Sequence, residues 1–184
     1  MLKKLRCLLL CEDIEQERLF RPILERHFRR IYVEPRKPHG GASFVLQKIE
    51  RWATYIRQHH QEAVGLLVVI DGDTAGLQGR LDALHSAAGS AGTSWEKRIA
   101  VCVPSRTVET WEMWLCGAHE VDEQTDYKNA FRREVERGTM SSRQAVEAWF
   151  APISPEMRRA EETRLPALAH GRKEVARLQQ FSKP

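Results

Sequence analysis

The chain has 184 residues, of which 42% are hydrophobic and 29% are charged, and its formal net charge is +4 at pH 7. These values are ordinary for a soluble globular protein, and the length suits one α/β domain or one domain with a helical tail. No apolar run is long enough to span a bilayer, which argues against a membrane protein. The mild positive charge favours polyanionic partners but does not by itself establish a nucleic-acid partner.

The N-terminal part alternates between strand-like and helix-like segments. LRCLLLC at 5–11 is a continuous apolar run, typical of a strand covered on both faces. It leads directly into acidic residues rather than into a cleavage site, so we expect a first core strand of a cytoplasmic protein, not a signal peptide. The apolar spacing then predicts a helix over 14–28, a short strand over 31–35 and an amphipathic helix over 42–60.

The same alternation continues to about residue 115. GLLVVI at 65–70 is the clearest strand, and a helix is predicted over 74–89. A fourth strand is predicted over 98–103, followed by a helix over 107–115. Strands alternating with helices imply an α/β fold, with about four strands in a mainly parallel, Rossmann-like sheet flanked by helices.

The pattern changes after this region. A polar segment follows, then a short helix with a plausible serine cap, then three prolines and a basic, mostly helical tail. We therefore divide the chain into an α/β domain over 1–137, which the resemblance described below implies to be catalytic, and a helical C-terminal extension over 138–184.

Acidic residues follow three of the predicted strands. Glu12 follows the first strand, Asp71 and Asp73 follow the third, and Glu109 lies just past the fourth. Because parallel strands end at one edge of the sheet, these carboxylates should converge in one crevice. A cluster of buried carboxylates is costly without a counter-charge, and Mg²⁺ or Mn²⁺ prefers such oxygen ligands. The plainer alternative is that Asp73 caps the helix beginning near Thr74.

Three short motifs carry a resemblance to a known family. They are LLLCEDIEQERLF at 8–20, VVIDGDTAG at 68–76 and VCVPSRTVETWEMWL at 101–115. In order and spacing they resemble the Toprim domain, in the branch of OLD-like nucleases and small standalone bacterial proteins. The resemblance covers roughly 5–116, with a weaker match at Tyr127 and Lys128. The chain departs from the family pattern at Asp13, where a glycine is usual, and at Gln16, where an acid is common.

The resemblance implies roles for individual residues. Glu12 would be a general acid/base or a metal ligand, while Asp71 and Asp73 would hold Mg²⁺ or Mn²⁺. Glu109 would be a further ligand or an orienting acid. Lys128 would lie near the scissile phosphate and stabilise developing charge.

Basic residues suggest where a nucleic acid could bind. Arg36 and Lys37 lie in a predicted loop, and Arg132 and Arg133 lie in a polar, basic segment. These side chains suit contacts with a phosphate backbone, although solvated helix faces would show the same pattern. The chain has no phosphate-binding loop of its own for ATP, and analogy with OLD-like proteins implies an ATPase partner.

The sequence thus leads to one main functional hypothesis and two alternatives. The main hypothesis is a divalent-metal-dependent nuclease that cleaves DNA or RNA, as an effector of anti-phage defence. The first alternative is a non-catalytic Toprim scaffold that binds nucleic acid or an ATPase complex. The second is a nucleotidyl transferase, ranked lower because the chain is too short for the additional domains of a primase. A homo-oligomer is left open.

Overall fold

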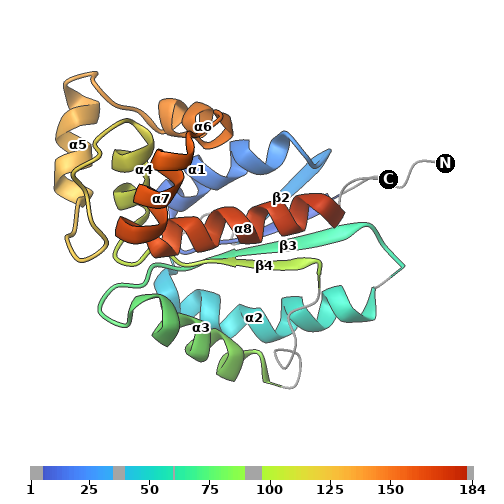
Figure 1. Cartoon of the computed structure of the whole chain (residues 1–184). Helices are drawn as coiled ribbons and strands as arrows, with labels where there is room; N and C mark the ends of the chain where they lie inside the picture. Colours follow the sequence, from blue (N-terminus) through green and yellow to red (C-terminus); the bar gives the residue numbers. More distant parts are fainter. Residues whose placement is uncertain (1–5, 35–39, 60, 90–96, 182–184) are drawn as a thin grey trace.

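The computed structural model describes residues 6–34, 40–59, 61–89 and 97–181 (Figure 1). The elements up to the fourth strand are β1 (Arg6–Leu10), α1 (Ile14–Glu25), β2 (Arg30–Glu34), α2 (Gly41–Gln58), β3 (Val64–Val69), α3 (Gly76–Ala87) and β4 (Ile99–Cys102). The helices that follow are α4 (Val108–Leu115), α5 (Lys128–Glu136), α6 (Ser142–Phe150), α7 (Pro155–Arg164) and α8 (Pro166–Phe181). None of the helices in these ranges is long and apolar enough to cross a membrane.

The strands form one parallel sheet in the order β2-β1-β3-β4. In the register of its centre, Cys7 lies between Ile31 of β2 and Gly65 of β3. The predicted α/β class with a four-stranded parallel sheet flanked by helices is therefore confirmed. Every residue of β3 is buried, which explains why its sequence is continuously apolar rather than alternating.

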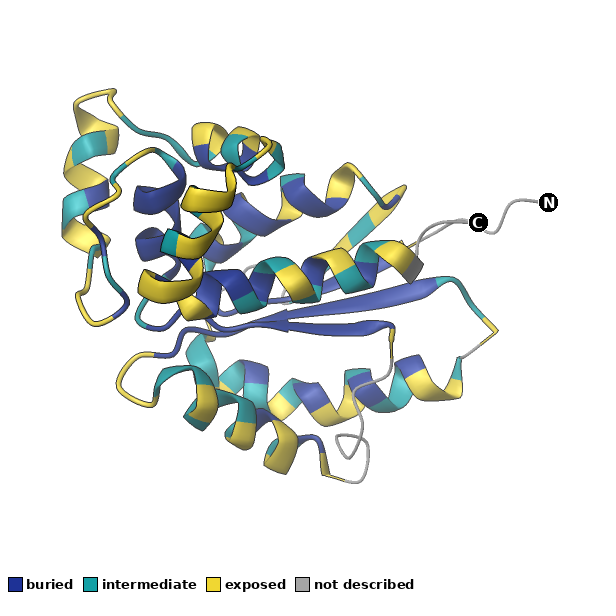
Figure 2. Ribbon diagram, viewed as in Figure 1, coloured by how far each residue is buried: buried dark blue, intermediate teal, exposed yellow. Residues whose placement is uncertain are grey.

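Helices cover the sheet on both faces, so that the strands lie in the buried middle layer (Figures 1 and 2). Leu8, Leu10, Leu66 and Val68 point to the face that packs against α2 and α3. The residues between them point the other way, into a second core with α1, α4, α6 and α8. This division follows from the two-residue period of a strand.

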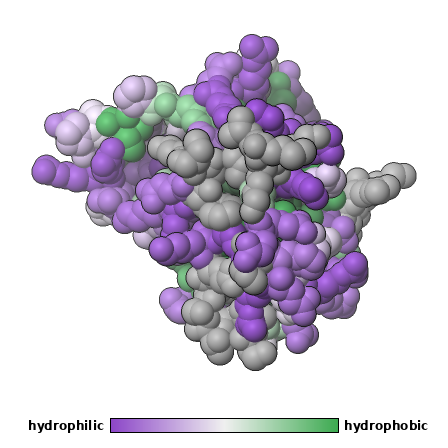
Figure 3. All heavy atoms as spheres, turned by 90° about the vertical axis from the view of Figure 1, so that its right-hand side faces the viewer, coloured by the Kyte–Doolittle hydropathy of each residue, from purple (hydrophilic) through white to green (hydrophobic). Residues whose placement is uncertain are grey.

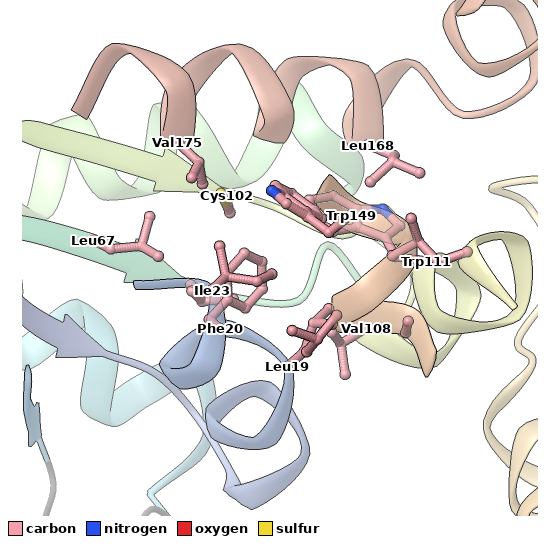
Figure 4. Packing of buried hydrophobic residues seen from close by; sticks show 14 of the residues in the cluster. Leu19, Phe20, Ile23, Leu67, Cys102, Val108, Trp111, Trp149, Leu168 and Val175 are labelled. Atoms are coloured by element: carbon pink, nitrogen blue, oxygen red, sulfur yellow. The ribbon is translucent and has the colours of Figure 1, made fainter. Parts of the chain in front are cut away.

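Aromatic residues fill the second core (Figure 4). Phe20 of α1 makes edge contacts with Trp111 of α4 and Trp149 of α6, with ring centroids 6.0 and 5.9 Å apart. Leu168 and Val175 of α8 are also buried there, at 0% and 1% exposure. Residues 138–181 therefore share a hydrophobic core with the sheet. The boundary at residue 137 remains a prediction.

Helix α8 also covers the backbone of β4, which is an edge strand. The backbone N–H of Val101 donates to Glu174 Oε2 at 3.1 Å, and Arg177 donates to the carbonyl oxygen of Ile99. Unpaired edge groups invite pairing with another chain, and these side chains occupy them instead. This edge of the sheet is thus closed by the C-terminal helix.

The strands all begin at the same side of the molecule. That side faces the viewer in Figure 3, where the described atoms are mainly hydrophilic with small, separate hydrophobic areas. The opposite side, where the strands end, holds the loops that carry the predicted acidic residues.

Candidate carboxylate site

The parallel sheet brings three of the predicted acids to one edge. Glu12 comes two residues after β1, Asp71 two residues after β3, and Glu109 is the second residue of α4, which follows β4. Their exposures are 8%, 8% and 6%, respectively. Buried carboxylates are rare unless they are paired, so their position needs a physical explanation.

Glu12 and Asp71 are joined directly and through Gln16. The backbone N–H of Asp71 donates to Glu12 Oε1 at 2.6 Å. Gln16 Oε1 accepts from the backbone N–H of Glu12, and Gln16 Nε2 donates to Asp71 Oδ1, both at 2.9 Å. Gln16 is fully buried. Its amide therefore fixes the end of β1 relative to the end of β3.

Asp13 explains how Gln16 comes to be placed there. It is the N-cap of α1, and its Oδ1 accepts from the backbone N–H of Gln16 at 2.9 Å. This capping starts the helix directly after Glu12, so that position 16 turns back toward the strand ends. The residue that departs from the Toprim glycine is thus engaged in the helix cap.

Gly72 is needed because two backbones approach closely. Its N–H donates to the carbonyl oxygen of Pro104 at 2.6 Å. A Cβ at this position would lie 2.3 Å from the carbonyl oxygen of Ser105 and 2.9 Å from that of Pro104. Only glycine fits without moving the loop after β4, so the D-G-D turn is tied to the neighbouring strand end.

Asp73 lies apart from the buried pair. Its backbone is left-handed, with φ of +47°, and its side chain is 55% exposed. Helix α3 begins only at Gly76, with Ala75 as its N-cap. The prediction that Asp73 caps this helix is therefore wrong, because its backbone is left-handed rather than extended and its carboxylate pairs with Arg80.

Arg80 of α3 holds the D-G-D turn from the other side. Its Nε donates to the carbonyl oxygen of Asp71 at 2.7 Å, and its Nη2 pairs with Asp73 Oδ2 at 2.8 Å. The Arg106 guanidinium also donates to the carbonyl oxygen of Asp73, at 3.2 Å. Two cations thus flank the turn that carries the acids.

Burial makes the acids at this edge weak. It raises the pKa of Glu12 to about 7, although the Asp71 N–H and the Arg80 charge act in the opposite direction. Burial, together with the charge of Glu12, raises the pKa of Asp71 well above its usual range. Burial also raises the pKa of Glu109, and the nearby charge of Lys128 lowers it in part. The site therefore disfavours its own full ionisation.

The predicted basic residues are distributed unevenly. Lys128 begins α5, and its charge lowers the pKa of Glu109 in part, although no ion pair joins the two side chains in the described part of the chain. Arg132 and Arg133 are exposed on α5. Arg36 and Lys37 lie outside the described residues.

Sequence reasoning assigned no role in the site to three residues of this region. Gln16 was noted only as a departure from the family pattern, and Arg80 gave no signal beyond its place in the helix after D-G-D. Glu112 is fully buried, and neither of its carboxyl oxygens has a hydrogen bond of ordinary length. Burial raises its pKa to about 8, and the Ser142 hydroxyl lowers it only in part. The sequence already indicates that Glu112 lies three residues after Glu109 on one helical face, but Glu112 was not included among the expected ligands.

The donor atoms suit a hard divalent cation, but they are not assembled around one point. Among the described residues, no three acidic, cysteine or histidine side chains converge as a ready metal-binding group. Glu12 and Asp71 are neighbouring oxygen donors with raised pKa values, which a cation would relieve. Asp73 would become a third ligand only if its ion pair with Arg80 were broken. The chemistry of the donors therefore fits Mg²⁺ or Mn²⁺, with Glu12 and Asp71 as the core of the site.

We compared the chain with protein-family models, with curated proteins and with solved structures. None of the three comparisons found a match.

Proposed function

We propose that this protein is a divalent-metal-dependent nuclease that hydrolyses phosphodiester bonds of DNA or RNA at the Glu12–Asp71 edge. The observation that carries the proposal is the Glu12–Gln16–Asp71 network, which ties two residues with buried carboxylates to each other at the ends of parallel strands. Such an arrangement costs stability, and a cation with a phosphate substrate offsets this cost.

Each residue of the site would have its own role in the reaction. Glu12, with a pKa of about 7 in the metal-free protein, can hold or release a proton near neutral pH, as a general acid or base must; as a metal ligand, its alternative role, it would be ionised. Bound Mg²⁺ or Mn²⁺ would polarise the phosphoryl oxygen and would take Glu12, Asp71 and Asp73 as ligands, with Glu109 as a further acid. Lys128 and Arg80 carry positive charge at the same edge and would stabilise the charge on the phosphate.

The test is a cleavage assay on supercoiled DNA, linear DNA and tRNA, with Mg²⁺, with Mn²⁺ and with EDTA. We expect metal-dependent cleavage of at least one substrate by the wild type. Asp71→Asn should reduce it by about a hundredfold or more, as loss of a group that stabilises the transition state does. Asp82→Asn, on the exposed face of α3, is the matched control and should cleave normally. A wild type that is inert on the whole panel would refute the proposal.

A non-catalytic scaffold is the second candidate function, and one observation favours it. Arg80 already pairs with Asp73, so the turn has a counter-charge without any metal. As a scaffold, the protein would bind nucleic acid or an ATPase partner. Calorimetry of Mn²⁺ with the wild type and with Asp71→Ala/Asp73→Ala distinguishes the two functions. The nuclease requires wild-type binding that the double variant loses, whereas the scaffold predicts no Mn²⁺ binding in either protein.

The remaining alternatives rest on the resemblance alone. A nucleotidyl transferase would incorporate nucleotides on a single-stranded template, which the same purified protein can be tested for. An anti-phage effector would be toxic to the cell in a manner that depends on Asp71. Expression of Asp71→Asn beside the wild type tests that role.

A further inference from the structure

A pocket lies away from the carboxylate pair, beside the other edge strand of the sheet. It encloses about 350 Å³ between α2 and the strands β1 and β2. Tyr32 of β2 stands in register with Leu8 of β1, on the face that α2 covers. Helix α2 covers Leu8 but leaves Tyr32 46% exposed. The pocket therefore forms where the helix layer stops short of the edge strand.

Aromatic rings form the walls of this pocket. Trp52 and Tyr55, one turn apart on α2, meet edge to face with ring centroids 5.8 Å apart. Tyr32 contributes the third ring from β2. Leu8 and Ile56 supply apolar surface between them. A concave site of this size, with aromatic walls and a few polar groups, is typical of pockets for small molecules.

The polar groups lie at opposite ends of the pocket. Arg6 begins β1, and Glu34, paired with Leu10, ends β2, so the two are about 13 Å apart at 3.3 Å per residue. Within the described residues, no hydrogen bond or ion pair engages the Arg6 guanidinium or the Glu34 carboxylate. An occupant that complements this pocket has an anionic group, a flat ring and N–H donors. A nucleotide has all three.

The Glu34 end of the pocket lies next to the candidate site. The backbone N–H of Cys11 donates to the carbonyl oxygen of Glu34 at 3.3 Å, and Cys11 directly precedes Glu12. From Leu8 to Glu12 the chain advances about 13 Å. A strand of nucleic acid at the carboxylates therefore needs only a few nucleotides to reach the pocket.

We propose that this pocket holds one unstacked nucleobase of a single-stranded nucleic acid, with the adjoining phosphate at Arg6 and an exocyclic amine at Glu34. The inference rests on the proposed function and names its substrate class, because a base inside a duplex cannot leave its stack without cost. Stacking on aromatic side chains is the usual way in which proteins hold single strands without reading their sequence.

The experiment measures binding rather than cleavage. The parent is Asp71→Asn in EDTA, and the probes are a fluorescent single strand and a fluorescent duplex of about twelve nucleotides, followed by anisotropy. Tyr32→Ala should weaken single-strand binding by about tenfold, the usual effect of losing one stacked base. Tyr32→Phe keeps the ring and should bind as the parent does. Arg6→Gln should weaken the single strand and lessen the salt dependence of its binding. Duplex binding should change little in any variant.

Three results would overturn the inference. The first is Tyr32→Ala binding single strands as tightly as the parent. The second is a free mononucleotide competing as well as the strand, which would make the pocket a nucleotide site. The third is a change in the oligomeric state of Tyr32→Ala, measured by sedimentation, with unaltered strand binding. This result would make the pocket a contact between two copies of the chain. If Tyr32→Ala loses strand binding while the wild type shows no metal-dependent cleavage, the nuclease proposal is refuted and the proposed role of the pocket is retained.

Discussion

Replacing Glu12 by glutamine in the metal-free protein tests the central electrostatic argument. Glutamine keeps an Oε1 acceptor for the backbone N–H of Asp71, removes the ionisation and replaces the second carboxyl oxygen by an NH2 group. Burial raises the pKa of Glu12 from 4.5 to about 7, so the folded protein holds this proton more tightly than the unfolded chain does. Each pKa unit corresponds to 1.36 kcal/mol, so ionising Glu12 in the folded state costs about 3 kcal/mol.

The sign of the effect follows from the raised pKa. The contribution of Glu12 to stability is fully present below pH 4.5 and is lost as the pH rises through about 7. Urea unfolding in EDTA from about pH 4 to about pH 8 should therefore show Glu12→Gln gaining about 3 kcal/mol over the wild type. Glu15→Gln is the control, because this partly exposed α1 residue pairs with Arg18 on the surface. A gain below about 1 kcal/mol, or an equal gain in the control, would refute the reasoning.

Three further predictions concern the residues that support the site and the core. Gly72→Ala should lower the free energy of unfolding by about 1–3 kcal/mol, because its Cβ would meet the backbone of Ser105. The control is Gly79→Ala in α3, whose Cβ would meet only the Ala75 side chain and which should change the free energy of unfolding by less than about 1 kcal/mol. Urea unfolding measures both variants. Arg80→Gln should raise the pKa of Glu12 further, because the positive charge of Arg80 lowers that pKa. NMR titration of the Glu12 carboxyl measures the shift, and an unchanged pKa would show that Arg80 acts only as a surface residue. Arg172→Met should destabilise the fold by about 3 kcal/mol, because it leaves the 3%-exposed Glu161 side chain without its partner at 3.0 Å; a thermal midpoint equal to that of the wild type would contradict this.

The fold could be predicted because periodicity is a local signal. The continuous apolar run at 64–69 and the helical spacing over 41–58 are each readable within one element. The convergence of Glu12 and Asp71 followed from topology, since parallel strands end together. These features need no knowledge of which side chains meet.

The errors and omissions concern residues whose roles are determined by tertiary contacts. The cap role of Asp73 failed because its carboxylate pairs with Arg80, seven residues further along the chain, which no local pattern reveals. Arg80 was missed because its partners are seven and nine residues away. Gln16 was noted only as a departure from the family pattern, although a neutral amide is what lets one side chain both accept from Glu12 and donate to Asp71.

The way in which α8 closes β4 has a consequence for the order of folding. During synthesis the strands of the sheet emerge before α8, which follows them in the sequence. Until α8 has been made, β4 is an open edge, and the core lacks Leu168 and Val175. Because domains fold as units once their core is complete, the nascent sheet should remain unfinished, and prone to pairing with other chains, until α8 has emerged. Helix α8 thus sets the earliest point of synthesis at which this core can be completed.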